Sequence, residues 1–366
     1  MCGIVGYIGE SQAAPILLDG LAKLEYRGYD SAGIATFDGE SIQIMKSQGR
    51  LKVLSELSHD GKLLPGKVGI GHTRWATHGA PSEANSHPHY NEDRSIVVVH
   101  NGIIENYLKL KEKLEAKGYK MISDTDTEIV AHLLDYYYKG NPLEAITKLI
   151  HRVEGSYAFG IMFKEFPNEI FAVRKESPLI VGKAEDGNII ASDVPAVLRY
   201  TRNVCFINNH EIAKLTKDSI EFYNEDQEII EKEFVAIDWD VDAAEKGGYE
   251  HFMLKEMFEQ PKAILDTFAP RIKKNDIEIE ELGMSDEDIR AIKKIQIVAC
   301  GSASHVGNTA KYVFEGMTRI PVEVDCASEF RYRDPILEEG TLVVVISQSG
   351  ETADTLAGLR EAKRKG

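Results

Sequence analysis

The sequence predicts a two-domain protein in which an α+β domain precedes an α/β domain. The 366 residues exceed one domain at roughly 150 residues per domain. Short consecutive strands mixed with amphipathic helices fill residues 1–237, whereas strands alternate with helices from residue 250 onward. The stretch 238–249 is acidic, contains two adjacent glycines and lacks periodicity, which is typical of a linker. We therefore predict domains at 1–237 and 250–366.

Elements of the first domain follow from apolar runs and helical periodicity. Strands are predicted at 3–8, 95–100, 156–163, 169–173, 188–191 and within 212–232. Helices are predicted at 13–25, 107–117, 126–138 and 142–153, with a short one at 195–200. Because several strands follow one another directly, we expect antiparallel sheets.

Elements of the second domain alternate. Helices at 252–267 and 285–293 come first, and Ser285 and Asp288 have the spacing of a capping box. Strands at 295–299, 322–325 and 342–346 then alternate with helices from His305, around Ser328 and from Glu351. This order predicts a parallel, doubly wound sheet. Three strands are fewer than the roughly five or six of an average sheet, so we expect an incomplete α/β domain.

Composition excludes several classes of protein. The 43 basic and 59 acidic residues give a net charge of −16, which disfavours nucleic-acid binding. No apolar run approaches the roughly 20 residues of a membrane-spanning helix, and the N-terminus does not read as a signal peptide, so we expect a cytoplasmic protein. The four cysteines are scattered, and His78, His87 and His89 lack a carboxylate or thiol at ligand spacing. We predict no metal and no cofactor.

Cys2 is the first candidate for chemistry. Its side chain is small enough for Met1 to be removed, which would leave a free α-amine on the same residue as the thiol. An α-amine titrates near 7.7 to 8.0, about where a general base for a thiol must titrate. The alternative is that Cys2 is only a small apolar residue at the start of a buried strand.

Four motifs occur in a fixed order along residues 1–237. They are Cys2-Gly3-Ile4-Val5-Gly6, Glu25-Tyr26-Arg27-Gly28-Tyr29-Asp30-Ser31-Ala32-Gly33, Gly71-His72-Thr73-Arg74-Trp75-Ala76-Thr77-His78-Gly79 and His100-Asn101-Gly102-Ile103-Ile104-Glu105-Asn106. Together they resemble the glutamine amidotransferases of the N-terminal-nucleophile class. The resemblance implies stacked antiparallel sheets between helices, with Cys2 as the nucleophile.

Attack on a glutamine side-chain amide creates an oxyanion that needs preorganised donors. The Asn101 side chain and the Gly102 N–H supply two, as the resemblance also implies. Free glutamine carries a carboxylate and an ammonium, and the resemblance assigns these to Arg74 and Asp126. Asp126 could instead be the N-cap of a helix. The resemblance further implies a substrate loop of Trp75, Thr77 and His78, with Trp75 at the mouth of an ammonia passage; taken alone, Trp75 is more simply a core aromatic.

A phosphate site is predicted in the second domain. The run Ser347-Gln348-Ser349-Gly350-Glu351-Thr352 follows an apolar strand and opens a helix, where free N–H groups and hydroxyls favour an anion. An ordinary polar loop with a serine cap is the alternative. The run, together with residues 247–256, is similar to the glutamine–fructose-6-phosphate aminotransferase family. The resemblance implies that Ser302, Ser347, Gln348, Ser349 and Thr352 hold the sugar phosphate. Where the family usually has Cys-Gly-Thr-Ser, this chain has Cys300-Gly301-Ser302-Ala303. Ala303 lacks the hydroxyl for one sugar contact, unless the neighbouring Ser304 replaces it.

This resemblance implies an enzyme of hexosamine synthesis that takes ammonia from glutamine to convert fructose 6-phosphate to glucosamine 6-phosphate, as a homodimer at full length. The family's second isomerase subdomain has no counterpart in the 366 residues. We therefore expect glutamine hydrolysis without transfer to sugar. Two alternatives are an amidotransferase with another acceptor, such as a phosphoribosyl compound, and a noncatalytic sugar-phosphate-binding regulatory protein. The presence of Cys2, Arg74, Asn101 and Asp126 disfavours the regulatory protein.

Overall fold

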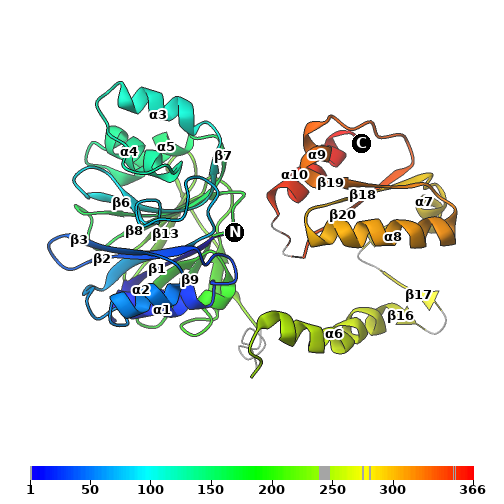
Figure 1. Cartoon of the computed structure of the whole chain (residues 1–366), viewed down its shortest axis with the longest axis horizontal. Coiled ribbons are helices and arrows are strands. Elements are labelled where there is room, and N and C mark those ends of the chain that lie inside the picture. The colour runs from blue at the N-terminus through cyan, green and yellow to red at the C-terminus, as the bar shows by residue number, and fades with distance from the viewer. Residues whose placement is uncertain (1, 239–247, 274–275, 280–281, 349, 351) are drawn as a thin grey trace. The chain divides into compact units, whose positions relative to one another are not determined.

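A computed structural model describes residues 2–238, 248–273, 276–279, 282–348, 350 and 352–366. The chain divides into two compact units, Met1–Glu245 and Lys246–Gly366 (Figure 1). Most of the linker predicted at 238–249 lies outside the described residues. The predicted domain boundaries therefore remain predictions.

Two antiparallel sheets form the first unit, as expected. The first sheet contains β1 (Gly3–Gly9), β2 (Ser31–Phe37), β3 (Ile42–Gln48), β4 (Val68–Arg74), β9 (Ile180–Lys183), β10 (Gly187–Ala191), β11 (Asn203–Phe206) and β15 (Val235–Ala236). Its strand order is β15-β11-β9-β10-β1-β4-β2-β3. The second contains β5 (His89–Tyr90), β6 (Ile96–Ile104), β7 (Gly155–Phe163), β8 (Ile170–Lys175), β12 (Ile212–Leu215), β13 (Ile220–Tyr223) and β14 (Ile229–Ile230). Its order is β14-β13-β12-β8-β7-β6-β5.

Helices cover the outer faces of both sheets, which gives four layers (Figure 1). The first sheet carries α1 (Ala13–Ala22) and α2 (Leu51–Leu57), and the second carries α3 (Tyr107–Glu115), α4 (Thr127–Tyr137) and α5 (Pro142–Ile150). The alternation of a strand shows in β1: Val5 belongs to the core beneath α1, whereas Ile4 and Ile8 belong to the core between the sheets. The centre of each sheet is thus buried on both faces.

The predicted helices at 13–25, 107–117, 126–138 and 142–153 are confirmed as α1, α3, α4 and α5, each of them shorter at one or both ends. The helix expected at 195–200 is instead one 3-10 turn, η1 (Val194–Ala196), entered through the Asp193 side chain. No element was predicted within 26–94, where β2, β3, β4, α2 and β5 lie. Two glycines interrupt β4 and polar residues dominate β3, which weakens the strand signal.

The second unit has a three-stranded parallel sheet in the order β19-β18-β20, which confirms the predicted topology. These strands are β18 (Lys294–Ala299), β19 (Val322–Cys326) and β20 (Thr341–Ile346). Helix α8 (Ser302–Thr318) packs on one face, and α9 (Ala327–Tyr332) and α10 (Ala353–Arg364) pack on the other. Helix α8 begins three residues before the predicted His305, because Gly301 already turns the chain with a positive φ.

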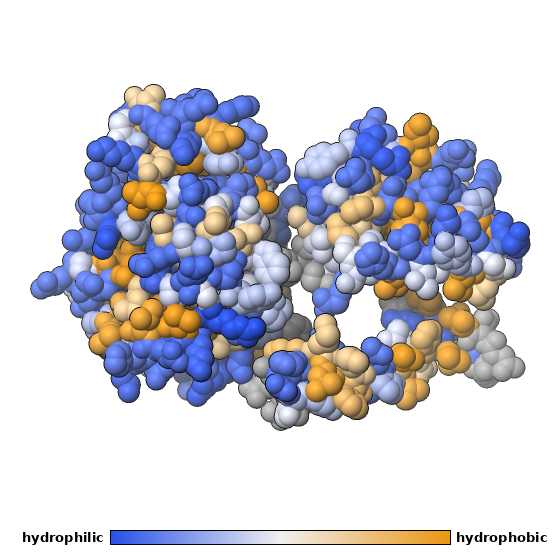
Figure 2. Space-filling view, in the orientation of Figure 1, coloured by the Kyte–Doolittle hydropathy of each residue, from blue (hydrophilic) through white to orange (hydrophobic). Residues whose placement is uncertain are grey.

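The remaining elements of this unit precede its sheet. They are α6 (Phe252–Phe268), η3 (Ala269–Arg271), β16 (Ile272–Lys273), β17 (Asp276–Ile277) and α7 (Asp286–Arg290). The predicted capping box of α7 is confirmed, since the Ser285 and Asp288 side chains each accept from the other's backbone N–H. Hydrophobic side chains such as Met253 and Phe258 are exposed along α6 (Figure 2). In the described part of the chain, no helix is long and apolar enough to cross a membrane.

Candidate active site

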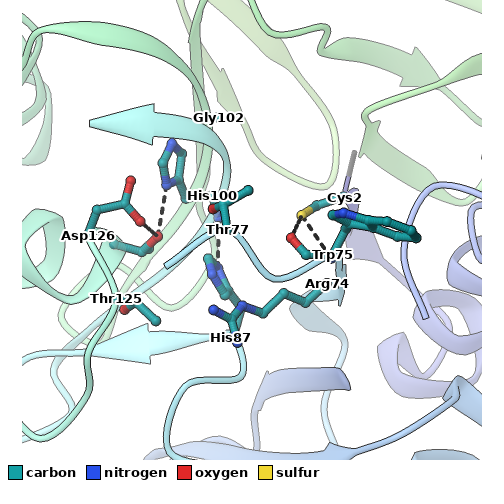
Figure 3. Close-up of a pocket in the computed structure, with 10 residues that line it drawn as sticks. Cys2, Arg74, Trp75, Thr77, His87, His100, Gly102, Thr125 and Asp126 are labelled. Carbon is teal, nitrogen blue, oxygen red and sulfur yellow. Dashed lines mark hydrogen bonds between the residues drawn. The ribbon is translucent and has the colours of Figure 1, made fainter. Parts of the chain in front are cut away.

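A pocket in the first unit brings together residues from both sheets and from the loops that follow them (Figure 3). The residues that line it are Cys2, Arg74, Trp75, Thr77, His87, His100, Gly102, Thr125, Asp126 and Thr127. Six of the eight residues predicted to serve the glutamine site therefore line a single pocket, and the other two are Asn101 and His78. Asn101 and His78 contact residues of this lining.

Cys2 lies at the start of β1, beside the end of β4. Because Gly3 pairs with Thr73 in this antiparallel ladder, Cys2 lies next to Arg74 and Trp75. Its Sγ accepts a hydrogen bond from the Trp75 N–H at 3.2 Å. Burial raises the pKa of the Cys2 thiol, and the Trp75 N–H opposes that rise. The resting thiol therefore keeps its proton and needs a base before it can attack.

Asn101 and Gly102 come from β6 of the second sheet. Asn101 Nδ2 donates to the carbonyl oxygen of Cys2 at 2.9 Å, so this side-chain amide lies directly beside the thiol residue. Gly102 has a φ of 125°, and a Cβ added there would lie 2.1 Å from the carbonyl oxygen of Ser156. Only glycine fits this backbone position. The two predicted oxyanion donors thus stand at one edge of the pocket.

Arg74 ends β4 and is 3% exposed. Its Nη2 donates to the carbonyl oxygens of His78 and of Gly79, the latter at 3.1 Å. Its Nη1 is buried and has no hydrogen-bond partner among the described residues. A buried guanidinium nitrogen without a partner is costly, so this nitrogen suits an anionic group that enters the pocket. Burial lowers the pKa of Arg74, while the negative charges of Asp30 and Asp126 act in the opposite direction.

Asp126 precedes α4 and is 4% exposed. Asp126 occupies the N-cap position of this helix, as the alternative predicts, but its side chain makes no capping hydrogen bond. Instead, Oδ2 accepts from the Ile104 N–H at the end of β6, at 2.8 Å. The carboxylate is thereby held in the lining of the pocket (Figure 3).

The loop after β4 folds back over Arg74. Trp75 is 47% exposed and packs edge-to-face on Tyr29, with ring centroids 5.4 Å apart, so the reading of Trp75 as a core aromatic is wrong. Thr77 lines the pocket, and its Oγ1 lies 3.3 Å from Nδ1 of His78. Asp30 accepts from the Ala76 N–H and ties this loop to the β2 end of the first sheet.

Sequence reasoning missed four lining residues: His87, His100, Thr125 and Thr127. His100 and the two threonines adjoin predicted site residues in the chain, which was the available signal. His72, His87, His89 and His100 are all buried, and burial lowers the pKa of each. In the described ranges, no group of three or more His, Cys, Asp or Glu side chains could hold a metal ion.

The predicted phosphate loop lies in the second unit, between β20 and α10. Ser347 Oγ accepts from the Gly350 N–H at 3.0 Å and lies 3.4 Å from Thr352 Oγ1. Thr352 directly precedes the first residue of α10. Ser302 is exposed at the first position of α8, beyond the end of β18, and Gln348 is also exposed. Ser349 lies outside the described residues.

Comparisons with known proteins divide the chain in the same way. Residues 72–199 match a family model described as a glutamine amidotransferase domain, and residues 288–366 match one described as a SIS domain. The glutamine–fructose-6-phosphate aminotransferase (isomerizing) of Caldanaerobacter subterraneus is 59% identical over all of this chain, and that of Clostridium acetobutylicum is 57% identical. The chain spans 60% of the length of each of these relatives.

Among solved structures, the chain is similar to the glutamine phosphoribosylpyrophosphate amidotransferase of B. subtilis, with a TM-score of 0.55 and 23% identity. The match covers 88% of this chain and 65% of that one, and it supports the predicted amidotransferase fold. With the two family models in this order and relatives that align over the whole of this chain, the chain belongs to the family of glutamine–fructose-6-phosphate aminotransferases, of which it comprises the glutamine amidotransferase domain and part of a SIS domain.

Proposed function

We propose that the first unit hydrolyses the side-chain amide of glutamine, with Cys2 as nucleophile. The observation that carries this proposal is the pocket in which a thiol, a side-chain amide and an unpartnered buried guanidinium nitrogen come together. Such a set suits a substrate that carries an amide at one end and a carboxylate at the other.

The proposed reaction begins when removal of Met1 exposes the α-amine of Cys2. This amine takes the thiol proton, and Sγ bonds to the amide carbon of glutamine. The oxygen becomes an oxyanion that accepts from Asn101 Nδ2 and the Gly102 N–H. The tetrahedral intermediate expels ammonia, which carries away the proton from the amine. Water then cleaves the thioester and releases glutamate and the free thiol.

Recognition of free glutamine is assigned to two other side chains of the pocket, which do not act on the amide. Arg74 Nη1 binds the α-carboxylate, and Asp126 binds the α-ammonium. The substrate loop with Trp75, Thr77 and His78 closes over the substrate, with Trp75 at the ammonia exit. The close packing of this loop on Arg74 supports the assignment, because substrate binding and loop position then share one side chain.

For the second unit we propose the first part of a site for fructose 6-phosphate, with glucosamine 6-phosphate as the product of the longer enzyme. The sequence of the relatives and the hydroxyls at the ends of β18 and β20 support this proposal. Ser302, Ser347, Gln348, Ser349 and Thr352 would hold the phosphate. We further propose domain boundaries at 1–237 and 250–366 and, for the full-length enzyme, a homodimer.

Glutamate release from glutamine tests the first proposal directly. The full chain is assayed together with mass spectrometry of its N-terminus and of material treated with a thiol-alkylating reagent. Thiol-dependent turnover by chains that lack Met1 is expected. Chains with a free Cys2 amine that release no glutamate would contradict the proposal and favour a noncatalytic sugar-phosphate-binding protein.

A further inference from the structure

His72 lies in the first sheet but contacts the second. It belongs to β4 and is fully buried, and its Nε2 lies 2.9 Å from the carbonyl oxygen of His100 and 3.0 Å from Oδ1 of Asn101. Both of these residues belong to β6. The imidazole therefore bridges the two sheets at the point where the side-chain amide beside Cys2 is anchored.

The direction of these hydrogen bonds is fixed by the carbonyl groups at the two ends. The His100 carbonyl can only accept, so His72 Nε2 must carry a proton. The Cys2 carbonyl can also only accept, so the group of Asn101 that faces it, at 2.9 Å, must be the NH₂. Oδ1 of Asn101 is then the atom that faces His72, where it accepts. Only this orientation of the Asn101 amide gives a hydrogen-bond donor to the Cys2 carbonyl and an acceptor to His72 Nε2–H.

The proton on His72 Nε2 is protected from changes in pH. Burial lowers the pKa of His72 to about 3, with smaller contributions from His100 and Arg74. The ring stacks on His87, with centroids 4.1 Å apart and an angle of 14° between the planes. His72 Nδ1 is buried and lacks a partner in the described part of the chain, as expected for the unprotonated nitrogen of a neutral ring. His72 is therefore a neutral, rigid donor across the neutral pH range.

We propose that His72 is a positioning residue that locks the Asn101 side-chain amide with its NH₂ group toward Cys2. The inference rests on the proposed glutamine hydrolysis, in which Asn101 is an oxyanion donor. One N–H of Asn101 is used by the Cys2 carbonyl, and the other has no acceptor among the described residues. Without the His72 donor, the amide can rotate and present Oδ1 to the developing oxyanion, which repels it.

The test compares how the full chain binds glutamate and glutamate 5-semialdehyde. The Cys2 thiol adds across the aldehyde group: an S–C bond forms, the thiol proton passes to the former carbonyl oxygen, and that oxygen occupies the oxyanion position. Glutamate forms no such adduct. The ratio of the two affinities therefore reports the oxyanion donors separately from the rest of the pocket.

In His72→Ala we expect this ratio to fall by about 10²-fold, the scale of losing one oxyanion donor, with glutamate affinity nearly unchanged. In His72→Gln the side-chain NH₂ replaces Nε2–H, so we expect the ratio to recover. His132→Ala is the matched control, because His132 is also a buried imidazole but lies beside Glu128, with its Nε2 3.5 Å from Oε1, and not beside Asn101. An unchanged ratio in His72→Ala, or an equal loss in the control, would overturn the proposal.

A second measurement does not depend on any turnover or ligand. In nitrogen-15 labelled chain, the His72 ring should carry its proton on Nε2, and the Asn101 NH₂ signals should shift and broaden in His72→Ala but not in His132→Ala. A proton on Nδ1 would overturn the inference. If the wild-type chain shows the expected signals yet binds neither compound, the proposed glutamine site fails while the positioning role of His72 stands.

Discussion

The two units hold their candidate functional groups in different ways. In the first unit, Cys2, Arg74 and Asn101 lie on or directly beside interior strands of the two sheets, and partly buried hydrogen bonds fix Asn101 and Arg74. In the second, Ser302, Ser347 and Thr352 stand at helix starts and on a loop at the ends of parallel strands. The first arrangement is set by packing between two sheets, whereas the second depends on backbone ends and a few hydroxyls. A site of the first kind is preorganised by its own unit.

The largest effect that would test this contrast is the loss of the nucleophile. Cys2→Ala should reduce glutamate release by at least about 10⁴-fold, because no other thiol lines the pocket in the described residues. The assay is glutamate release at saturating glutamine. Cys326→Ala is the matched control, since Cys326 is an exposed free thiol in the second unit. Equal losses in both variants would contradict the assignment.

The second largest effect should come from acid, which we expect to destabilise the first unit more than the second. Burial lowers the pKa of His72, His87, His89 and His100 in the folded state, so their contribution to stability is complete above a pH of about 6.5 and falls below it. Each such histidine lowers the free energy of unfolding by up to about 1.4 kcal/mol for every pH unit below 6.5, until the pH reaches the pKa of that histidine in the folded state. Among the described residues, the second unit has only the exposed His251 and His305.

Hydrogen exchange at pH 7.5 and at pH 5.0, corrected for intrinsic rates, measures this difference peptide by peptide. Protection should fall much more in β1, β4 and β6 than in β18. Equal loss of protection in both sheets would show that the buried histidines do not govern acid stability. Because the folded pKa of His72 is about 3, the loss should continue to grow below pH 5.

A smaller effect is expected from the carboxylate contact. Arg74→Lys keeps the positive charge but loses the planar guanidinium with its paired N–H donors. KM for glutamine should therefore rise by about 10- to 100-fold, while kcat changes little. Arg199→Lys is the matched control, because Arg199 is largely exposed, pairs with Asp19 and is not among the residues that line the pocket. A fall in kcat at constant KM would place Arg74 in the chemical step instead of in substrate binding.

The same contrast explains how far the sequence could predict the molecule. Helices such as α3 and α5 were predictable, because each buries one face and so leaves a clear periodic pattern. The parallel arrangement of β18, β19 and β20 was predictable because strands alternate with helices in this part of the chain. Strands β2 and β4 were not, since β4 contains two glycines and both lie buried on both sides. Their side chains contact partners far along the chain, which periodicity does not record.

At the candidate site, the chemistry of Cys2, Arg74 and Asn101 could be predicted from residue type and motif. The buried histidines could not. His87 and His89 have no predicted role once a metal site is excluded, yet His87 stacks on His72 of β4, and its ring centroid lies 4.7 Å from that of His89. Asp126 was ambiguous for a related reason: whether a carboxylate caps its own helix or accepts from Ile104 depends on β6 lying alongside.

The smallest effects should appear in the second unit. Ser347 Oγ already accepts from Gly350 N–H and lies near Thr352, so its removal loosens the loop as well as deleting one hydroxyl. Ser347→Ala should weaken the affinity of the full chain for fructose 6-phosphate by about fivefold, the scale of one hydrogen bond, and leave glutamate release unchanged. Calorimetric titration with the sugar phosphate measures the affinity.

The opposite change sharpens this last prediction. Ala303 follows Ser302 at the start of α8 and is partly exposed, at the position where the resemblance implies a hydroxyl. Ala303→Ser should therefore tighten binding by a factor of about three, and the double variant with Ser347→Ala should fall between the two single variants if the hydroxyls act on one phosphate. If neither substitution changes the affinity, the loop is an ordinary polar loop at the start of a helix. The two units would then differ in function as well, with a binding site in the first unit and no sugar-phosphate site in this loop of the second.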